Sequence, residues 1–407
     1  MTTLRDVRGR FDRNATSRKA WFPGKPLFGL SMLFAVLLYM LPTAARSASS
    51  FDQAWSDLQA LARKEGKVII SIGAVPDYNP IFEAFTKKFG IAVHTQGGSG
   101  SARTSRILAE QKSGRYTADI GFLSVSVAAR RLEPAGGLVD LGGLLIHPDV
   151  IDKSKWYKGQ HWYVDQGKTE MIFAFSVRAQ NFWQFWYNTE KLTKADISAL
   201  KSPHDFLQPK WKAMMADQAW SDPGRLGGMT EVYLAPDAGP EWVKKYLTEM
   251  DVAFTSDPRL EETWLVRGRN PLKWSEGNIG DALRTLKAKG LPINEVQIPR
   301  ATATLEARGS ECCVNVFKNA PNPKAAQLFV NWFLSKEGQE LIHDIDPPRP
   351  YTSLREDISP GKTSEVTRRM KGVEYSFRDF DPEYLTNEES ARDFILKAFD
   401  EGQKKRR

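Results

Sequence analysis

Histidine and cysteine are scarce in this sequence. Its 407 residues include five histidines, which are scattered without paired spacing, and two cysteines, which are adjacent. Metal sites in proteins usually gather histidine, cysteine or carboxylate ligands at short, regular spacings. The sequence also lacks a phosphate-binding Walker A motif. We therefore expect no metal site and no cofactor.

The two cysteines, Cys312 and Cys313, lie in a strand-like run over residues 312–317. Neighbouring side chains on a strand point to opposite faces, so a bond between them requires a distorted backbone. The prediction is therefore two buried free thiols. Export to an oxidising compartment leaves a disulfide between them as the alternative.

Positive charge is also scarce once the N-terminus is set aside. The whole chain has a net charge of +8, but residues 1–45 contain seven Lys or Arg and two Asp, which leaves 50 cationic against 47 anionic residues and a net charge of +3. A nearly neutral chain lacks the basic surface that nucleic acids require. We expect no nucleic-acid partner.

The apolar run Leu27–Leu41 is shorter than the roughly 20 residues that a membrane span needs. It follows the basic start of the chain and precedes Pro42–Ala45, which is the pattern of a secretory signal peptide with cleavage after Ala45. Residues 1–45 are therefore predicted to be a signal peptide, with a retained anchor as the alternative. The mature protein is expected in the periplasm, without stable membrane insertion.

What the sequence does contain is an alternation of strand-like and helix-like runs. This alternation predicts an α/β fold with mostly parallel sheets, and the chain is too long for one typical core. The basic tail Lys404–Arg407 is expected to be solvated. Strands are predicted at 67–72, 91–95, 117–123, 171–177, 182–187, 213–217, 293–298 and 312–317, and helices at 104–111, 241–250, 280–289 and 390–399.

The glycine-rich turn Gly97–Arg103 lies between the strand at 91–95 and the helix at 104–111. Glycine and serine let several backbone N–H groups converge at a helix start, where the helix dipole favours an anion. Arg103 and Arg106 fall near the first turn, where a cation is unfavourable unless a negative group is close. The turn therefore favours an anion site, and a helix cap with solvated arginines is the alternative.

The same strand, turn and helix also resemble the nucleophile elbow of a hydrolase, in which Ser99 would be the nucleophile. His147 or His343 follows in the chain order that a catalytic triad requires. However, Ser101 stands where the motif has its last glycine. A periplasmic serine hydrolase is therefore the enzymatic alternative, and we expect the protein not to be an enzyme.

Several segments, taken in order, carry a family resemblance. They are Ala60–Val68, Ala84–Ile91, Leu108–Gln111, Gly114–Asp119, Tyr187–Thr189, Pro209–Lys212 and Gly309–Gln339. Together they resemble the periplasmic solute-binding proteins of ABC importers, in the branch that includes the ferric-iron-binding proteins. The resemblance covers nearly the whole mature chain.

This resemblance implies a two-lobed Venus-flytrap fold, in which two α/β lobes joined by crossing strands close on a ligand. Residues 46–180 and 308–407 would form lobe one, and residues 181–307 lobe two. The implied function is capture of a small solute by a monomer, for delivery to an inner-membrane ABC permease. A ligand-binding partner of a membrane sensor would share the fold.

The resemblance stops at the iron site. Ferric-binding relatives hold iron with an adjacent tyrosine pair, whereas this chain has no tyrosine between Tyr246 and Tyr351. Arg103, Arg225 and Lys273 instead suit a carboxylate, phosphate or phosphonate. We therefore expect an anionic ligand that an aromatic side chain covers. The predicted ligand-binding residues are Ala74, Tyr78, Ser99, Gly100, Ser101, Arg103, Ser124, Arg225, Lys273 and Trp274.

Overall fold

The computed structural model describes residues 50–73, 78–98, 100–125, 128–164, 169–221, 226–275, 278–307, 312–346 and 350–406. Its contacts divide the chain into Met1–Gln53 and Ala54–Arg407, and the fold below is that of the second unit. The predicted signal peptide and the candidate residues Ala74, Ser99 and Arg225 lie outside the described residues.

The first sheet consists of short strands in the order β2-β1-β3-β10-β4. The strands β1, β2 and β3 are parallel, as predicted, but β10 runs antiparallel to both β3 and β4. The sheet is therefore mixed. β10 can run antiparallel because the chain enters it from another long strand and not through a crossover helix. The bounds are β1 Lys67–Ser71, β2 Ala92–Gln96, β3 Ile120–Phe122, β4 Phe173–Ala174 and β10 Cys313–Val316.

Amphipathic helices cover this sheet and complete the first core. Phe329 and Phe333 of α11 (Pro323–Leu334) pack on Phe122 of β3, with ring centroids 6.5 and 5.1 Å apart. The other helices of this part of the chain are the one at residues 50–65, α2 Asn79–Phe89, α3 Gly100–Lys112, α5 Pro148–Ile151 and α12 Lys336–His343.

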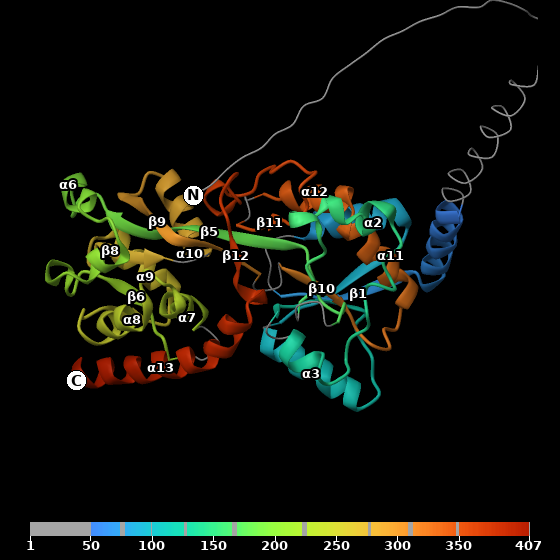
Figure 1. Cartoon of the computed structure of the whole chain (residues 1–407), viewed down its shortest axis with the longest axis horizontal. Helices are drawn as coiled ribbons and strands as arrows, with labels where there is room; N and C mark the ends of the chain where they lie inside the picture. Colours follow the sequence, from blue (N-terminus) through green and yellow to red (C-terminus); the bar gives the residue numbers. More distant parts are fainter. Residues whose placement is uncertain are drawn as a thin grey trace, which may run out of the picture. The chain divides into compact units, whose positions relative to one another are not determined.

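Two long antiparallel strands, β5 (Ser176–Asn188) and β9 (Ile293–Glu306), run side by side between the two cores (Figure 1). Val177 and Ala179 of β5 belong to the first core, and Trp183, Phe185 and Tyr187 belong to the second. These are the crossing strands that the resemblance implies. Shorter strands pair with them, namely β8 Leu272–Ser275 and β11 Thr352–Ser353 with β5, and β12 Ser376–Phe377 with β9.

The second core lies among helices and a small parallel sheet, and it includes the C-terminal helix α13 (Pro382–Arg406), which packs against α7 and α8 (Figure 1). α13 is longer than the predicted helix at 390–399. The elements of this part are α6 Lys194–Ser198, β6 Ala216–Gln218, α7 Gly227–Leu234, α8 Gly239–Thr248, β7 Ala253–Thr255, α9 Pro258–Val266 and α10 Asn278–Ala288.

The end of α13 corrects one part of the prediction of a solvated basic tail, because Lys404 and Lys405 are exposed but Arg406 is not fully so. Arg406 donates hydrogen bonds of 2.6 Å to the carbonyl oxygens of Leu247 and Val252, and its guanidinium lies over the Phe254 ring. Buried residues of α13, among them Ile395, pack in the second core. The sequence analysis assigns this helix to lobe one, and Glu388 does pair with Arg130 there at 2.6 Å. Its buried apolar side chains, however, pack with residues assigned to lobe two.

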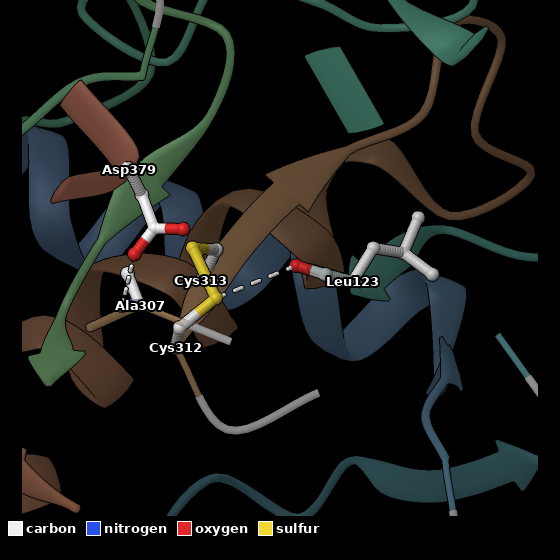
Figure 2. The surroundings of a disulfide bond; sticks show 5 residues. All are labelled: Leu123, Ala307, Cys312, Cys313 and Asp379. Carbon is white, nitrogen blue, oxygen red and sulfur yellow. Dashed lines mark hydrogen bonds between the residues drawn. A yellow bond between two sulfur atoms is a disulfide. The ribbon is translucent and has the colours of Figure 1, made fainter. Parts of the chain in front are cut away.

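The adjacent cysteines form a disulfide, which corrects the prediction of two free thiols. Both are fully buried, and Cys312 Sγ lies 3.8 Å from the Leu123 carbonyl oxygen (Figure 2). Just upstream, the Ala307 N–H donates to Asp379 Oδ2 at 2.6 Å. Cys312 lies just before β10, so the pair is not held in regular strand geometry. The argument that neighbouring side chains on a strand point to opposite faces therefore does not apply to these two cysteines.

Candidate ligand-binding site

The carboxyl ends of β1, β2 and β3 meet at one edge of the first sheet. Ser71, near the end of β1, pairs with Gln96 of β2 and with Gly121 of β3. The glycine turn follows β2 directly, and α3 begins at Gly100. Ligands of open α/β sheets gather at such an edge. We call residues 96–98, Arg103, Arg106 and residues 122–124 the rim.

Arg103 connects the parts of the rim. Only 3% of it is exposed, and it donates from Nε to the Gly98 carbonyl and from Nη1 to the Phe122 carbonyl, both at 3.1 Å. Burial and the nearby Arg106 lower the pKa of Arg103 to about 10. Both causes disfavour the positively charged form of Arg103. An anion bound beside the guanidinium would favour that charged form.

The rest of the rim is more open to solvent. Arg106 donates to Gln96 Oε1 at 3.0 Å, and its Nε lies 3.7 Å from Glu110. Ser124 is partly exposed after the end of β3. The structure therefore brings Gly100, Arg103 and Ser124 of the predicted set to one edge of the sheet. Ser101 lies in the first turn of α3.

The two aromatic residues that were expected to cover the ligand lie in the cores instead. Tyr78 is 3% exposed, and its ring packs 5.8 Å from Phe122 and 6.5 Å from Phe333. Trp274 is 4% exposed, with Trp220 and Trp242 each 6.2 Å away. Packing against other aromatics makes the Tyr78 ring part of the fold, and we withdraw it from the candidate site. Trp274 also lines a small pocket with Glu231 and Arg300, so its role at a ligand site stays a prediction.

Lys273 also differs from its predicted role. It is fully buried in β8, where Nζ donates to Glu261 Oε2 at 2.5 Å and lies 3.5 Å from Asp217 Oδ1. Burial raises the pKa values of both carboxyl groups, and the lysine opposes that rise. Its charge is therefore met by internal partners, and we withdraw it from the candidate site as well.

A second group of buried charges lies on the crossing strands and was missed by the sequence analysis. Arg378, in the turn after β12, has Nη1 at 3.0 Å from Glu231 and Nη2 at 2.9 Å from Glu306. Arg178 pairs with Glu306, and Arg300 pairs with Glu231. We call these residues, together with Gln180, which donates to both glutamates, the hinge cluster.

The hinge cluster is balanced internally. Its three arginines face Glu231 and Glu306, and Asp379 adds a third negative charge beside Arg378. Burial lowers the pKa of Arg378, but Tyr384 and the carboxylates outweigh burial and raise that pKa well above its usual value. The charges of the cluster are therefore met by one another without requiring a ligand, and removal of one partner would leave a costly buried charge. The signal in the sequence that could have revealed this cluster was the presence of polar residues within the otherwise apolar strand β5.

The structure argues against His343 as the base of the serine hydrolase that the sequence analysis gave as an alternative. His343 donates from Nδ1 to the Ser359 carbonyl at 2.6 Å and accepts at Nε2 from the Ser353 N–H at 2.8 Å. Because backbone groups occupy both ring nitrogens, this side chain has no nitrogen left to act as a base. In the part of the chain that the structure describes, no three His, Cys, Asp or Glu residues are grouped to hold a metal, and no helix is long and apolar enough to cross a membrane.

Comparison with known proteins adds a family and a set of similar folds. A family model described as bacterial extracellular solute-binding protein matches residues 81–365. An uncharacterized protein of Haemophilus influenzae is 25% identical over 338 residues, which cover 78% of this chain and 87% of that protein.

Solved structures share the two-lobed periplasmic-binding-protein fold. Iron-bound HitA from Pseudomonas aeruginosa has a TM-score of 0.57 and 18% identity, covering 82% of this chain and 99% of that one. AfuA from Actinobacillus pleuropneumoniae, with fructose-6-phosphate bound, has a TM-score of 0.54 and 18% identity, covering 83% and 99%. One of these two structures contains iron and the other contains fructose-6-phosphate. The likeness therefore establishes the fold and does not identify a ligand.

Proposed function

Because this chain belongs to the family of bacterial extracellular solute-binding proteins, we propose that it captures a small anionic solute in the periplasm and delivers it to an inner-membrane ABC permease. The proposal includes export by the signal peptide at residues 1–45 and a monomeric state. The observation that carries the anionic part is Arg103, which is buried at the carboxyl end of the first sheet with a lowered pKa.

The rim supplies the parts that an anion needs. The first N–H groups of α3 and the guanidinium of Arg103 both present positive charge at the glycine turn. Arg103 is held by two carbonyl oxygens, so its orientation is set before a ligand arrives. Preorganisation of this kind raises affinity because little side-chain freedom is lost on binding. The fructose-6-phosphate of the similar AfuA is itself an anion, which supports the same class of ligand.

The proposed mechanism is binding at the rim followed by closure of the second lobe. We propose that lobe one consists of residues 46–180 with residues from 308 to the turn at 378–380, and that α13 moves with residues 181–307, since its buried side chains pack there. The crossing strands β5 and β9 would carry the bending between the lobes.

The proposal is tested by thermal unfolding of the purified protein with inorganic phosphate, citrate, fructose-6-phosphate and ferric iron. A ligand that binds the folded state raises the melting temperature, and the stabilisation grows with the logarithm of the ligand concentration above its Kd. Arg103→Ala is expected to weaken binding of the active anion by about 1–3 kcal/mol, because a charged hydrogen bond is lost. Arg259→Ala, at an exposed arginine of α9, is the matched control.

Two results would contradict the proposal. Stabilisation by ferric iron and by none of the anions would replace the anionic solute with a metal. If Arg103→Ala lowers the melting temperature of the free protein but keeps the affinity for the anion, Arg103 only holds the turn.

A further inference from the structure

A cavity of about 440 Å³ lies apart from the rim and the hinge cluster and shares no residue with either. Its wall comes from residues 352–375, together with Tyr157 and His343. The volume falls in the range of roughly 300–1,000 Å³ that small-molecule pockets occupy. The part of the wall from Arg368 onward lies beyond the family match, which ends at residue 365.

The cavity has a surplus of positive charge. Four cationic side chains and one carboxylate, Glu356, line it. Arg355 is fully buried, and Asp149 and Asp357 each lie 2.8 Å from its Nη2, so its charge is met by groups behind the wall. Arg368 lies 3.9 Å from Glu365, so Arg369 and Lys371 remain against Glu356. An anion in this cavity would therefore be attracted to its wall.

Arg369 has the geometry of an anion-binding group. Its guanidinium lies over the Tyr157 ring at 4.5 Å, its Nη2 donates to the Ser353 carbonyl at 3.0 Å, and its Nη1 lies 3.3 Å from Glu356. These contacts fix the guanidinium plane, while five N–H donors exceed the two acceptors that the described residues supply. Burial lowers the pKa of Arg369, so a negative partner would stabilise its charged form.

The cavity also offers apolar surface. Met370 lines it and is 46% exposed, which is unusual for a large apolar side chain, and Ile358 and Val373 lie on the same wall. Burying such surface is favourable in proportion to its area. A ligand that fits both features has a negative group at one end and an apolar body.

We propose that this cavity is a second ligand site, which binds a small anion with an aromatic or apolar body, such as an aryl carboxylate. The negative group lies at Arg369 and Lys371, and the apolar body lies against Met370. The wall is attached to the crossing strands, because Tyr375 donates to Asn181 Oδ1 at 2.6 Å and Asn181 donates to the Arg368 carbonyl at 2.9 Å. Asn181 is where the β5–β9 register shifts, so the site is in contact with the segment between the lobes.

The test uses phenylacetate as the probe and the methyl resonance of Met370 as the reporter, in protein labelled with carbon-13 at the methionine methyl groups. The resonance is assigned by its loss in Met370→Leu. We expect phenylacetate to shift it and to saturate with a millimolar or lower Kd. Acetate, which lacks the ring, and 2-phenylethanol, which lacks the charge, are expected to bind at least about tenfold more weakly, since each has only one of the two features.

Variants separate this site from the rim. Lys371→Ala and Arg369→Ala are expected to weaken phenylacetate binding at least about fivefold, because each removes a positive charge from the wall. Lys362→Ala, at an exposed lysine of the same segment that pairs with Asp346 and does not line the cavity, should keep the wild-type affinity. Arg103→Ala should also keep it, so a failure of the rim proposal leaves this result untouched.

The proposal is overturned if the Met370 resonance does not move at about 10 mM phenylacetate, where a millimolar site would be nearly full. It is also overturned if Lys371→Ala and Lys362→Ala bind the probe equally well. If Arg369→Ala does not fold, the comparison of the two lysine variants decides.

Discussion

Arg103 of the rim and Arg378 of the hinge cluster are almost equally buried, at 3% and 4% exposure, yet their pKa values move in opposite directions. Burial and Arg106 lower the pKa of Arg103 to about 10. Around Arg378 burial acts in the same sense, but Tyr384, Glu231 and Glu306 outweigh it and raise the pKa. The surroundings of Arg378 thus favour its charged form, whereas the surroundings of Arg103 disfavour its charged form.

The difference follows from where each guanidinium finds its partners. The rim hydrogen bonds of Arg103 end on carbonyl oxygens, which carry only partial charge. The hinge cluster places full negative charges 2.9 and 3.0 Å from Arg378. Burial of a charge is costly in either place, and an anion bound at the rim would offset part of that cost at Arg103. The comparison therefore favours Arg103 as the arginine of the proposed anion site.

The largest expected effect comes from breaking the hinge cluster with Glu306→Ala. This change leaves the buried guanidinium groups of Arg178 and Arg378 without one carboxylate, and it should lower the free energy of unfolding by about 3–5 kcal/mol. Urea unfolding at neutral pH measures it. Glu374→Gln, at a side chain that is 95% exposed, is the control and should leave the urea midpoint unchanged. Equal midpoints for the two variants would show that the cluster does not hold the fold.

An intermediate effect is expected from His343, a buried group that avoids charge by staying neutral. Burial lowers its pKa below the ordinary value of about 6.5. As the pH falls through that ordinary value, the unfolded chain takes up a proton that the folded protein does not, so stability decreases toward acid. The contribution is at most about 1.4 kcal/mol per pH unit.

His343→Gln should therefore flatten the decline of the urea midpoint between about pH 7 and about pH 5. A slope identical to that of the wild type would mean that His343 takes up its proton over the same pH range in the folded protein as in the unfolded chain.

The smallest expected effect concerns the glycine turn that holds Arg103. Gly98 has a φ of +126°, and a β-carbon there would lie 3.3 Å from Arg103 Cγ. Gly98→Ala should therefore destabilise the protein by about 1 kcal/mol and displace Arg103, which also weakens anion binding. Gly97→Ala is the matched control, because a β-carbon at that position meets no atom within 4 Å. Equal stability and affinity in the two variants would show that the turn does not position Arg103.

Much of the fold could be predicted from the sequence. The strands β1, β2, β3 and β10 fall within or close to the predicted runs, because apolar periodicity is a local property of the chain. The glycine turn and Arg103 were placed correctly at the edge of the sheet, since the order of strand, turn and helix determines that position.

The hinge cluster could not be predicted in the same way. Glu231 comes from α7, Glu306 from β9 and Arg378 from the turn that precedes α13, and no local pattern connects these positions. The cavity depends equally on the packing of residues 352–375 beside Tyr157 and His343. Both features arise from residues far apart in the chain.

The sequence by itself determined the secondary structure pattern, the family and the position of the glycine turn, because each depends on residues that are neighbours along the chain. Only the tertiary structure decided which cations are already neutralised. Lys273 pairs with Glu261 and Asp217, and Arg378 pairs with Glu231 and Glu306, through distances that the sequence does not contain. Arg103 remains the candidate because it is buried at the carboxyl edge of the first sheet, where burial and Arg106 lower its pKa.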